Sequence, residues 1–254
     1  FSKIGNDIDG EVFGDNSGSS VSLSSDGSVV AIGAVTNDGN GTDSGHVRIY
    51  KNINNTWTQV GSDIDGEASN DYSGQSVSLS NDGSVVAIGA YGNDGNGTDT
   101  GHVRIYENIN NSWTQVGSDI DGEAAGDQSG SSISLSADGS VVAIGAPNAN
   151  ATYSGHARIY KNVDNIWVQV GDDIDGEAAE DYSGWSISLS DDGSVVAIGA
   201  TLNDGNGSDS GHVRIYQIDI DNTSPATLSE VEALNYIASN PDLITAFGID
   251  TAAA

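Results

Sequence analysis

Short segments in which polar and apolar residues alternate recur along most of the chain. In one copy, residues 76–80 alternate serine with valine or leucine, and residues 85–90 are apolar at nearly every position. Alternation with a period of two predicts a half-buried strand, and a short apolar run predicts a strand buried on both faces. The Asp82-Gly83 pair between them is typical of a tight hairpin turn, which needs positive φ angles. Segments 103–106 and 113–117 complete a predicted unit of four strands.

This unit occurs four times. The segment Gly45-His46-Val47-Arg48-Ile49-Tyr50 returns at 101–106, 155–160 and 211–216, at offsets of 56, 54 and 56 residues. Four antiparallel strands at this period are typical of a β-propeller blade. A single blade exposes apolar residues on both faces, so neighbouring blades must cover it. We therefore predict an all-β propeller of four four-stranded blades.

The two ends of the repeat region predict how the propeller closes. Residues 1–10 align with residues 57–66, which hold a fourth strand, whereas the last unit has only three strands. We therefore expect residues 1–9 to supply the missing outer strand and to close the ring. The predicted propeller covers residues 1–222, with blades at about 17–66, 73–122, 129–176 and 183–220 plus 1–9. The alternative is that further blades lie upstream of residue 1.

The last part of the chain has a helical pattern instead. Thr227 to Glu230 form a capping box, and apolar residues follow at helical spacing. Asn240-Pro241 is a typical helix start, and Gly248 is a typical stop. We expect a short α-helical segment over residues 225–254.

Residues 73–90 read Ser-Gly-Gln-Ser-Val-Ser-Leu-Ser-Asn-Asp-Gly-Ser-Val-Val-Ala-Ile-Gly-Ala. This motif resembles the FG-GAP repeats of propellers such as the integrin α-subunit head, and residues 145–147 spell Gly-Ala-Pro once. The resemblance covers about residues 1–218 and implies a propeller that binds protein ligands or sugars. The calcium loop of that family does not carry over, because only Asp-Gly connects the first two strands here. The tail, residues 233–248, resembles helical segments of secreted bacterial repeat proteins, which implies an extracellular location.

Charge narrows the range of partners. The chain has 37 acidic and 7 basic residues, a formal net charge of −30, and no cysteine. Such a surface repels phosphate backbones and anionic lipid, so we expect neither nucleic acid nor membrane surfaces as partners. No apolar run approaches the roughly 18 residues that span a bilayer. Cations are the natural partners of this chain.

Two acidic patterns are candidate Ca²⁺ sites, because hard cations prefer oxygen ligands. The first is a Gly/Asn/Asp loop in three of the four units: Asp38, Asn40, Asp43; Asp94, Asn96, Asp99; and Asp204, Asn206, Asp209. The alternative is an Asp-Ile-Asp-Gly-Glu pattern similar to the start of an EF-hand loop: Asp63, Asp65, Glu67, Asp71; Asp119, Asp121, Glu123, Asp127; and Asp173, Asp175, Glu177, Asp181. The same residue types also form plain turns.

Other repeated side chains have simpler interpretations. His46, His102, His156 and His212 occupy one repeat position, and we predict a structural role, because an enzyme rarely needs a catalytic residue four times. The arginine two residues later is predicted to be paired and partly buried. Trp185 is different, because its counterparts are Ser19, Gln75 and Ser131. It marks a ligand or partner contact, or it fills a local gap.

Together these patterns predict a non-enzymatic extracellular propeller that is stabilised by calcium. Its expected role is adhesion, matrix formation or assembly of a surface layer or filament, with a protein or glycan at the cell surface or a second copy of itself as partner. The alternative is a multivalent carbohydrate-binding propeller. An enzyme would need a chemically distinct residue set in one unit, and the near-identity of the units disfavours it.

Overall fold

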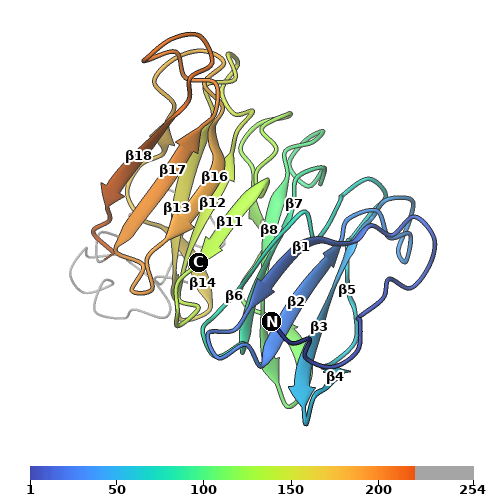
Figure 1. Cartoon of the computed structure of the whole chain (residues 1–254). Helices are drawn as coiled ribbons and strands as arrows, with labels where there is room; N and C mark the ends of the chain where they lie inside the picture. Colours follow the sequence, from blue (N-terminus) through green and yellow to red (C-terminus); the bar gives the residue numbers. More distant parts are fainter. Residues whose placement is uncertain (221–254) are drawn as a thin grey trace, which may run out of the picture.

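The computed structural model describes residues 1–220 and shows four antiparallel sheets side by side in chain order (Figure 1). The first sheet contains β1 (Ser17–Leu23), β2 (Val29–Ala34), β3 (His46–Ile53), β4 (Thr56–Gln59) and β5 (Ile64–Asp65). The second contains β6 (Ser76–Leu79), β7 (Val85–Ala90), β8 (His102–Ile109), β9 (Ser112–Gln115) and β10 (Ile120–Asp121). The third contains β11 (Ser132–Leu135), β12 (Val141–Ala146), β13 (His156–Val163), β14 (Ile166–Gln169) and β15 (Ile174–Asp175). The fourth contains β16 (Ser183–Leu189), β17 (Val195–Ala200) and β18 (His212–Gln217).

The four predicted strands of each repeat are present in the first three sheets, which confirms an all-β array of blade-like sheets. The predicted hairpin turn joins β6 to β7, where Gly83 has φ +71° and the Asp82 carboxylate accepts hydrogen bonds from Ser84 N and Ser80 Oγ. The sequence did not reveal the two-residue strands β5, β10 and β15. Each of them pairs with the start of the third strand of its own sheet.

The core lies between the sheets. Between the first and second sheets, Val47 and Ile49 of β3 pack with Leu79 of β6 and Ile88 of β7, all of them buried. Equivalent residues form the cores between the second and third sheets and between the third and fourth. Each sheet therefore supplies one face to each neighbour, as expected for repeats that cannot fold alone.

Backbone contacts also join successive sheets. A Cβ atom on Gly89 of β7 would lie 2.1 Å from the carbonyl oxygen of Gly130 in the next repeat, so only glycine fits there. The hairpin turns are linked by main-chain hydrogen bonds from Ser25 N to Asn81 O, from Asn81 N to Ala137 O, and from Ala137 N to Asp191 O, each 2.8 Å long. We call this series the turn ladder.

The expected closure through residues 1–9 is wrong. These residues form no strand with β18, and they lie against the first sheet, where the Ile4 carbonyl accepts from Trp57 Nε1 at 3.0 Å and the Asp9 carbonyl accepts from Arg48 at 2.7 Å. The reason lies in the repeat itself. In the next unit, Trp113 and Arg104 bind the carbonyls of Val60 and Asp65 in the same way, so this stretch is held by the blade that follows it.

The first and fourth sheets consequently stand at opposite ends of the row (Figure 1). Val21 and Leu23 on the first sheet are 65% and 59% exposed, and Val213 and Ile215 on the fourth are 64% and 70% exposed. Their counterparts inside the row are covered by a neighbouring sheet.

The predicted helical segment 225–254 lies outside the described residues. Within residues 1–220, no helix is long and apolar enough to cross a membrane.

Candidate metal centres

The Asp-Ile-Asp-Gly-Glu pattern divides between two histidines instead of converging on one point. Asp63 and Asp65 flank buried Ile64 in and beside β5, and their carboxylates lie 4.0 Å and 3.9 Å from Nδ1 of His46. After Gly66 the chain leaves this sheet, and the Glu67 carboxylate lies 3.8 Å from Nδ1 of His102 in the next sheet. Alternate residues of a strand share one face, which explains why the two aspartates stay together. The glutamate lies beyond the strand and is not held to that face.

The result is a repeated cluster of one histidine and two carboxylates; two copies lie at the junctions between blades, and the first lies between the first sheet and the stretch that precedes it. In the second sheet, Nδ1 of His102 lies 3.8 Å from Glu67 Oε2 and 3.8 Å from Asp119 Oδ2. The glutamate comes from the connection out of the preceding sheet, whereas the histidine and the aspartate belong to the same sheet. In each of three such groups, the candidate ligand atoms all lie within 4.8 Å of one another: Glu11, His46, Asp63; Glu67, His102, Asp119; and Glu123, His156, Asp173. We call these the junction clusters.

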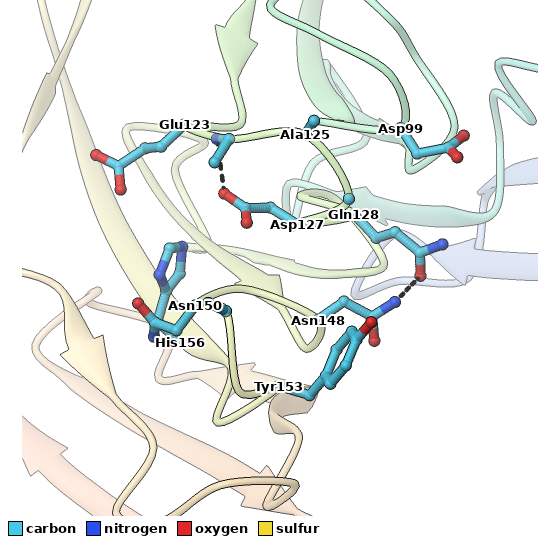
Figure 2. Close-up of a pocket in the computed structure, with 12 residues that line it drawn as sticks. Asp99, Glu123, Ala125, Asp127, Gln128, Asn148, Asn150, Tyr153 and His156 are labelled. Carbon is cyan, nitrogen blue, oxygen red and sulfur yellow. Dashed lines mark hydrogen bonds between the residues drawn. The ribbon is translucent and has the colours of Figure 1, made fainter.

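The third junction cluster opens into a hollow that Figure 2 shows in close-up. Glu123 and His156 both line this hollow, together with Asp127, whose carboxylate accepts a 2.8 Å hydrogen bond from Ala124 N. Nδ1 of His156 lies 3.7 Å from the Asp173 carboxylate. The glutamate side chain is 56% exposed, so the cluster is reachable from solvent.

The histidine of the second junction cluster is buried and neutral. His102 is 1% exposed, and neither ring nitrogen has a hydrogen-bond partner among residues 1–220. Burial, and secondarily the nearby Arg104 guanidinium, lower its pKa to about 4. The imidazole is therefore uncharged at neutral pH and keeps a lone pair, which is the form that binds metals.

The arginines of the first three repeats are paired and buried, and Arg214 of the fourth is partly buried and bonded to the Asp175 carbonyl. Arg104 is 6% exposed, donates a hydrogen bond to the Asp65 carbonyl at 2.6 Å, and lies over the Tyr106 ring. Its Nη1 is 3.7 Å from the second carboxylate oxygen of Glu67. The glutamate therefore lies between the guanidinium and the imidazole.

The carboxylates of these clusters repel one another. Burial raises the pKa of Glu67, and the charges of Asp119 and Asp71 raise it further against the opposing effect of Arg104. Burial also raises the pKa of Glu123, where a shared hydrogen bond and the charge of Asp173 act in the same direction. A cation placed between the two carboxylates would relieve this repulsion.

The aspartate four residues after the glutamate of each pattern does not join the cluster but stabilises the adjacent turn. The Asp71 carboxylate is buried and accepts hydrogen bonds from Glu67 N at 3.0 Å, Ala68 N at 2.8 Å and Asn93 Nδ2 at 3.2 Å. Asp127 and Asp181 accept from their own turns in the same manner. These carboxylates hold the turn that carries the glutamate.

The Gly/Asn/Asp loops form hydrogen bonds of their own. Asp38 Oδ1 accepts from Asp43 N at 2.8 Å, and the pairs Asp94–Asp99 and Asp204–Asp209 repeat this contact. The Asn40 side chain donates to the carbonyls of Gly66 and Glu67, and so ties the loop to the segment that carries the glutamate. In each loop, one carboxylate oxygen is thus already used in a hydrogen bond that holds the loop together. Calcium binding by these loops stays a prediction.

Trp185 lines a neighbouring hollow, which shares Gln128 with the hollow of the third junction cluster. The tryptophan is 58% exposed, meets the Tyr182 ring edge-on, and lines this hollow with Gln75, Tyr91, Gln128, Ser131 and Pro147. Gln75 and Ser131 occupy the same repeat position as the tryptophan, so three successive repeats contribute to one hollow. The sequence identified the position but did not reveal that its counterparts meet.

The sequence also contained a signal for the junction clusters. The histidine is followed 17 residues later by aspartate in the first three repeats, whereas position 229, at the same distance from His212, is serine and lies outside the described residues. Repetition of the histidine had suggested only a structural role. The fixed spacing to an acid was the more informative pattern.

Comparison with known proteins agrees with the repeat architecture. A family model described as FG-GAP repeat matches residues 62–106 and 174–216. The chain contains FG-GAP repeats. The first matched stretch ends in β8 and the second in β18, so each includes the first three strands of a blade. Each also includes residues of the connection that precedes the blade. No curated protein is significantly similar to the chain in sequence.

Two solved structures have a similar fold. Hydrazine synthase from Kuenenia stuttgartiensis is 15% identical with a TM-score of 0.50, and the match covers 82% of this chain and 49% of that one. A putative 6-phosphogluconolactonase from Bacteroides uniformis is 13% identical with a TM-score of 0.50, and the match covers 79% and 56%. This chain therefore spans about half the length of the structures it matches, and these similarities concern the fold alone.

Proposed function

We propose that this FG-GAP chain is a non-catalytic extracellular module for adhesion, matrix formation or surface assembly, stabilised by bound cations. The observation that carries the proposal is repetition: the same histidine, arginine and carboxylates recur in the first three repeats, and the arginine lies 3.7, 3.7 and 3.5 Å from the glutamate. An active site needs one chemically distinct set of groups, whereas a scaffold or a multivalent binder uses equal ones. The charge of −30 makes cations the expected ligands.

Calcium is the cation we propose for the Gly/Asn/Asp loops. Ligand binding to the folded state alone stabilises it by about 2.7 kcal/mol at a free concentration 100 times the Kd. The melting temperature should therefore rise when CaCl₂ is added to chelator-treated protein and fall again with EGTA. NaCl at equal ionic strength is the control, because any salt screens the repulsion within so acidic a chain. A melting temperature that responds equally to both salts would remove calcium from the proposal.

A second candidate function is glycan binding at the Trp185 hollow. An exposed indole beside the side-chain amides of Gln75 and Gln128 provides an apolar ring for a sugar face and polar groups for its hydroxyls. A glycan array should give signals that disappear in Trp185→Ala. Exposed Ile53→Ala is the matched control, since this side chain is 52% exposed on a different surface. An empty array, or signals that survive Trp185→Ala, would reject this site.

A further inference from the structure

We propose that each junction cluster binds a divalent transition-metal ion of the zinc class through its histidine, glutamate and aspartate. The sites are separate from the Gly/Asn/Asp loops proposed for calcium. They would be three in number, with the ligands Glu11, His46, Asp63; Glu67, His102, Asp119; and Glu123, His156, Asp173.

The distances in the second cluster fit an ion and not a hydrogen bond. Nδ1 of His102 is 3.8 Å from both carboxylate oxygens, and an N–H···O hydrogen bond ends at about 3.2 Å. An ion midway between this nitrogen and one of the oxygens would lie about 1.9 Å from each, which is half of their 3.8 Å separation. An ion off that line would lie farther from both atoms. Zinc binds histidine nitrogen at about 2.0–2.1 Å and carboxylate oxygen at about 2.0–2.2 Å, so little movement is needed.

The donor set selects the class of metal. Calcium and magnesium take oxygen ligands, whereas imidazole suits zinc, copper, iron and nickel. One nitrogen and two carboxylate oxygens leave a fourth position for water or a partner side chain. The glutamate and the aspartate of the second cluster are 46% and 31% exposed, so the ion has a path from solvent.

The buried histidine is the independent observation that indicates a ligand. A side chain only 1% exposed that points Nδ1 toward two carboxylates, without a hydrogen bond among the residues described, leaves a costly unsatisfied nitrogen. A purely structural histidine would donate to one of those carboxylates at normal distance. Metal coordination would satisfy this nitrogen and the two carboxylates together.

Binding at these positions would join parts of the chain that are distant in sequence. In the second cluster the glutamate follows β5 of the first sheet, whereas the histidine begins β8 and the aspartate precedes β10 of the second sheet. The ion would therefore fix one blade to the next. The third cluster would join the second and third sheets in the same way.

The test is zinc binding by the full chain after removal of metals with a chelator. Isothermal titration with ZnCl₂, in excess CaCl₂ to fill oxygen-only sites, should give three ions per chain. His102→Gln should remove one of the three, and Asp119→Asn should weaken the same site at least tenfold. His212→Gln is the matched control and should leave three, because the structure places Glu177 but no aspartate beside that histidine within the described part of the chain.

Binding of less than one zinc ion per chain overturns the proposal, as does an unchanged count in His102→Gln. Circular dichroism identifies a variant that has not folded, and Asp119→Asn then decides, because asparagine has nearly the same shape as the partly exposed aspartate and leaves no cavity. The calcium-dependent melting shift should be the same in His102→Gln as in the parent. Failure of the zinc sites and failure of the proposed calcium loops are thus distinguishable.

Discussion

The close approach of two glycines between neighbouring blades leads to a sharp prediction about stability. Gly89→Ala places a methyl group 2.1 Å from the Gly130 carbonyl oxygen and 2.4 Å from Ser76 Oγ. The serine can rotate, but the carbonyl belongs to the backbone of the next blade, so the two sheets must separate locally. The same movement breaks the 2.7 Å hydrogen bond from Ser76 to that carbonyl.

The expected cost combines two terms. Overpacking costs about 1–3 kcal/mol, and the upper part of that range applies because backbone must move. The lost hydrogen bond adds about 1 kcal/mol. A total of about 3–4 kcal/mol should lower the melting temperature by roughly 6–16 °C in a chain of this size.

The fourth repeat provides the matched control. Gly199 occupies the same position as Gly89, but its added methyl group would meet only the Ser186 side chain closely, at 2.4 Å from Oγ. Gly199→Ala should therefore cost less than about 1 kcal/mol, because a hydroxyl rotates freely. Thermal unfolding followed by circular dichroism measures both variants. Equal losses in the two variants would refute the reasoning, since strain within the sheet rather than contact between blades would then be the cause.

Two further predictions concern the core and the hairpin turns. Ile105→Ala removes a side chain that is 1% exposed, and it should lower the free energy of unfolding in urea by about 2–5 kcal/mol. Ile215 occupies the same repeat position but is 70% exposed, so Ile215→Ala should cost less than about 0.5 kcal/mol. Similar losses in the two variants would show that the end face is covered in solution. Hydrogen bonds from the Ser190 hydroxyl and from Ser194 lower the pKa of Asp192 to about 2. Its contribution to stability should be complete above pH 4 and disappear as the pH falls toward 2, so Asp192→Asn should flatten that part of the pH–stability curve. An NMR titration that gives this carboxyl group an ordinary pKa near 4 would contradict the assignment.

The sequence predicted the local structure well, because both strand patterns and the Asp-Gly turn depend on neighbouring residues. Residues 76–79 and 85–90 form strands as expected, and Gly83 has the positive φ angle that the turn requires. The strand Ile120–Asp121 was not predicted, because two residues give no periodic signal. Its pairing with β8 depends on where the chain returns after β9.

Closure failed as a prediction because similarity in sequence does not show which neighbour a segment contacts. Residues 1–10 match residues 57–66, but Trp57 and Arg48 hold them from the following sheet. The junction clusters were missed for a related reason. Glu67 is close to Asp65 in sequence, yet it lies beside His102, which is in the next repeat.

The turn ladder has a consequence for how such an array grows and diverges. Its linked positions carry four different side chains, Ser25, Asn81, Ala137 and Asp191, because the main-chain groups alone make a bond at every step; the Ser25 hydroxyl adds a second bond to the Asn81 carbonyl. A duplicated repeat therefore fits beside any other copy without matching residues at this position. Mutations can accumulate there without separating the blades, and the position is suited to attaching labels or grafted loops at one per repeat.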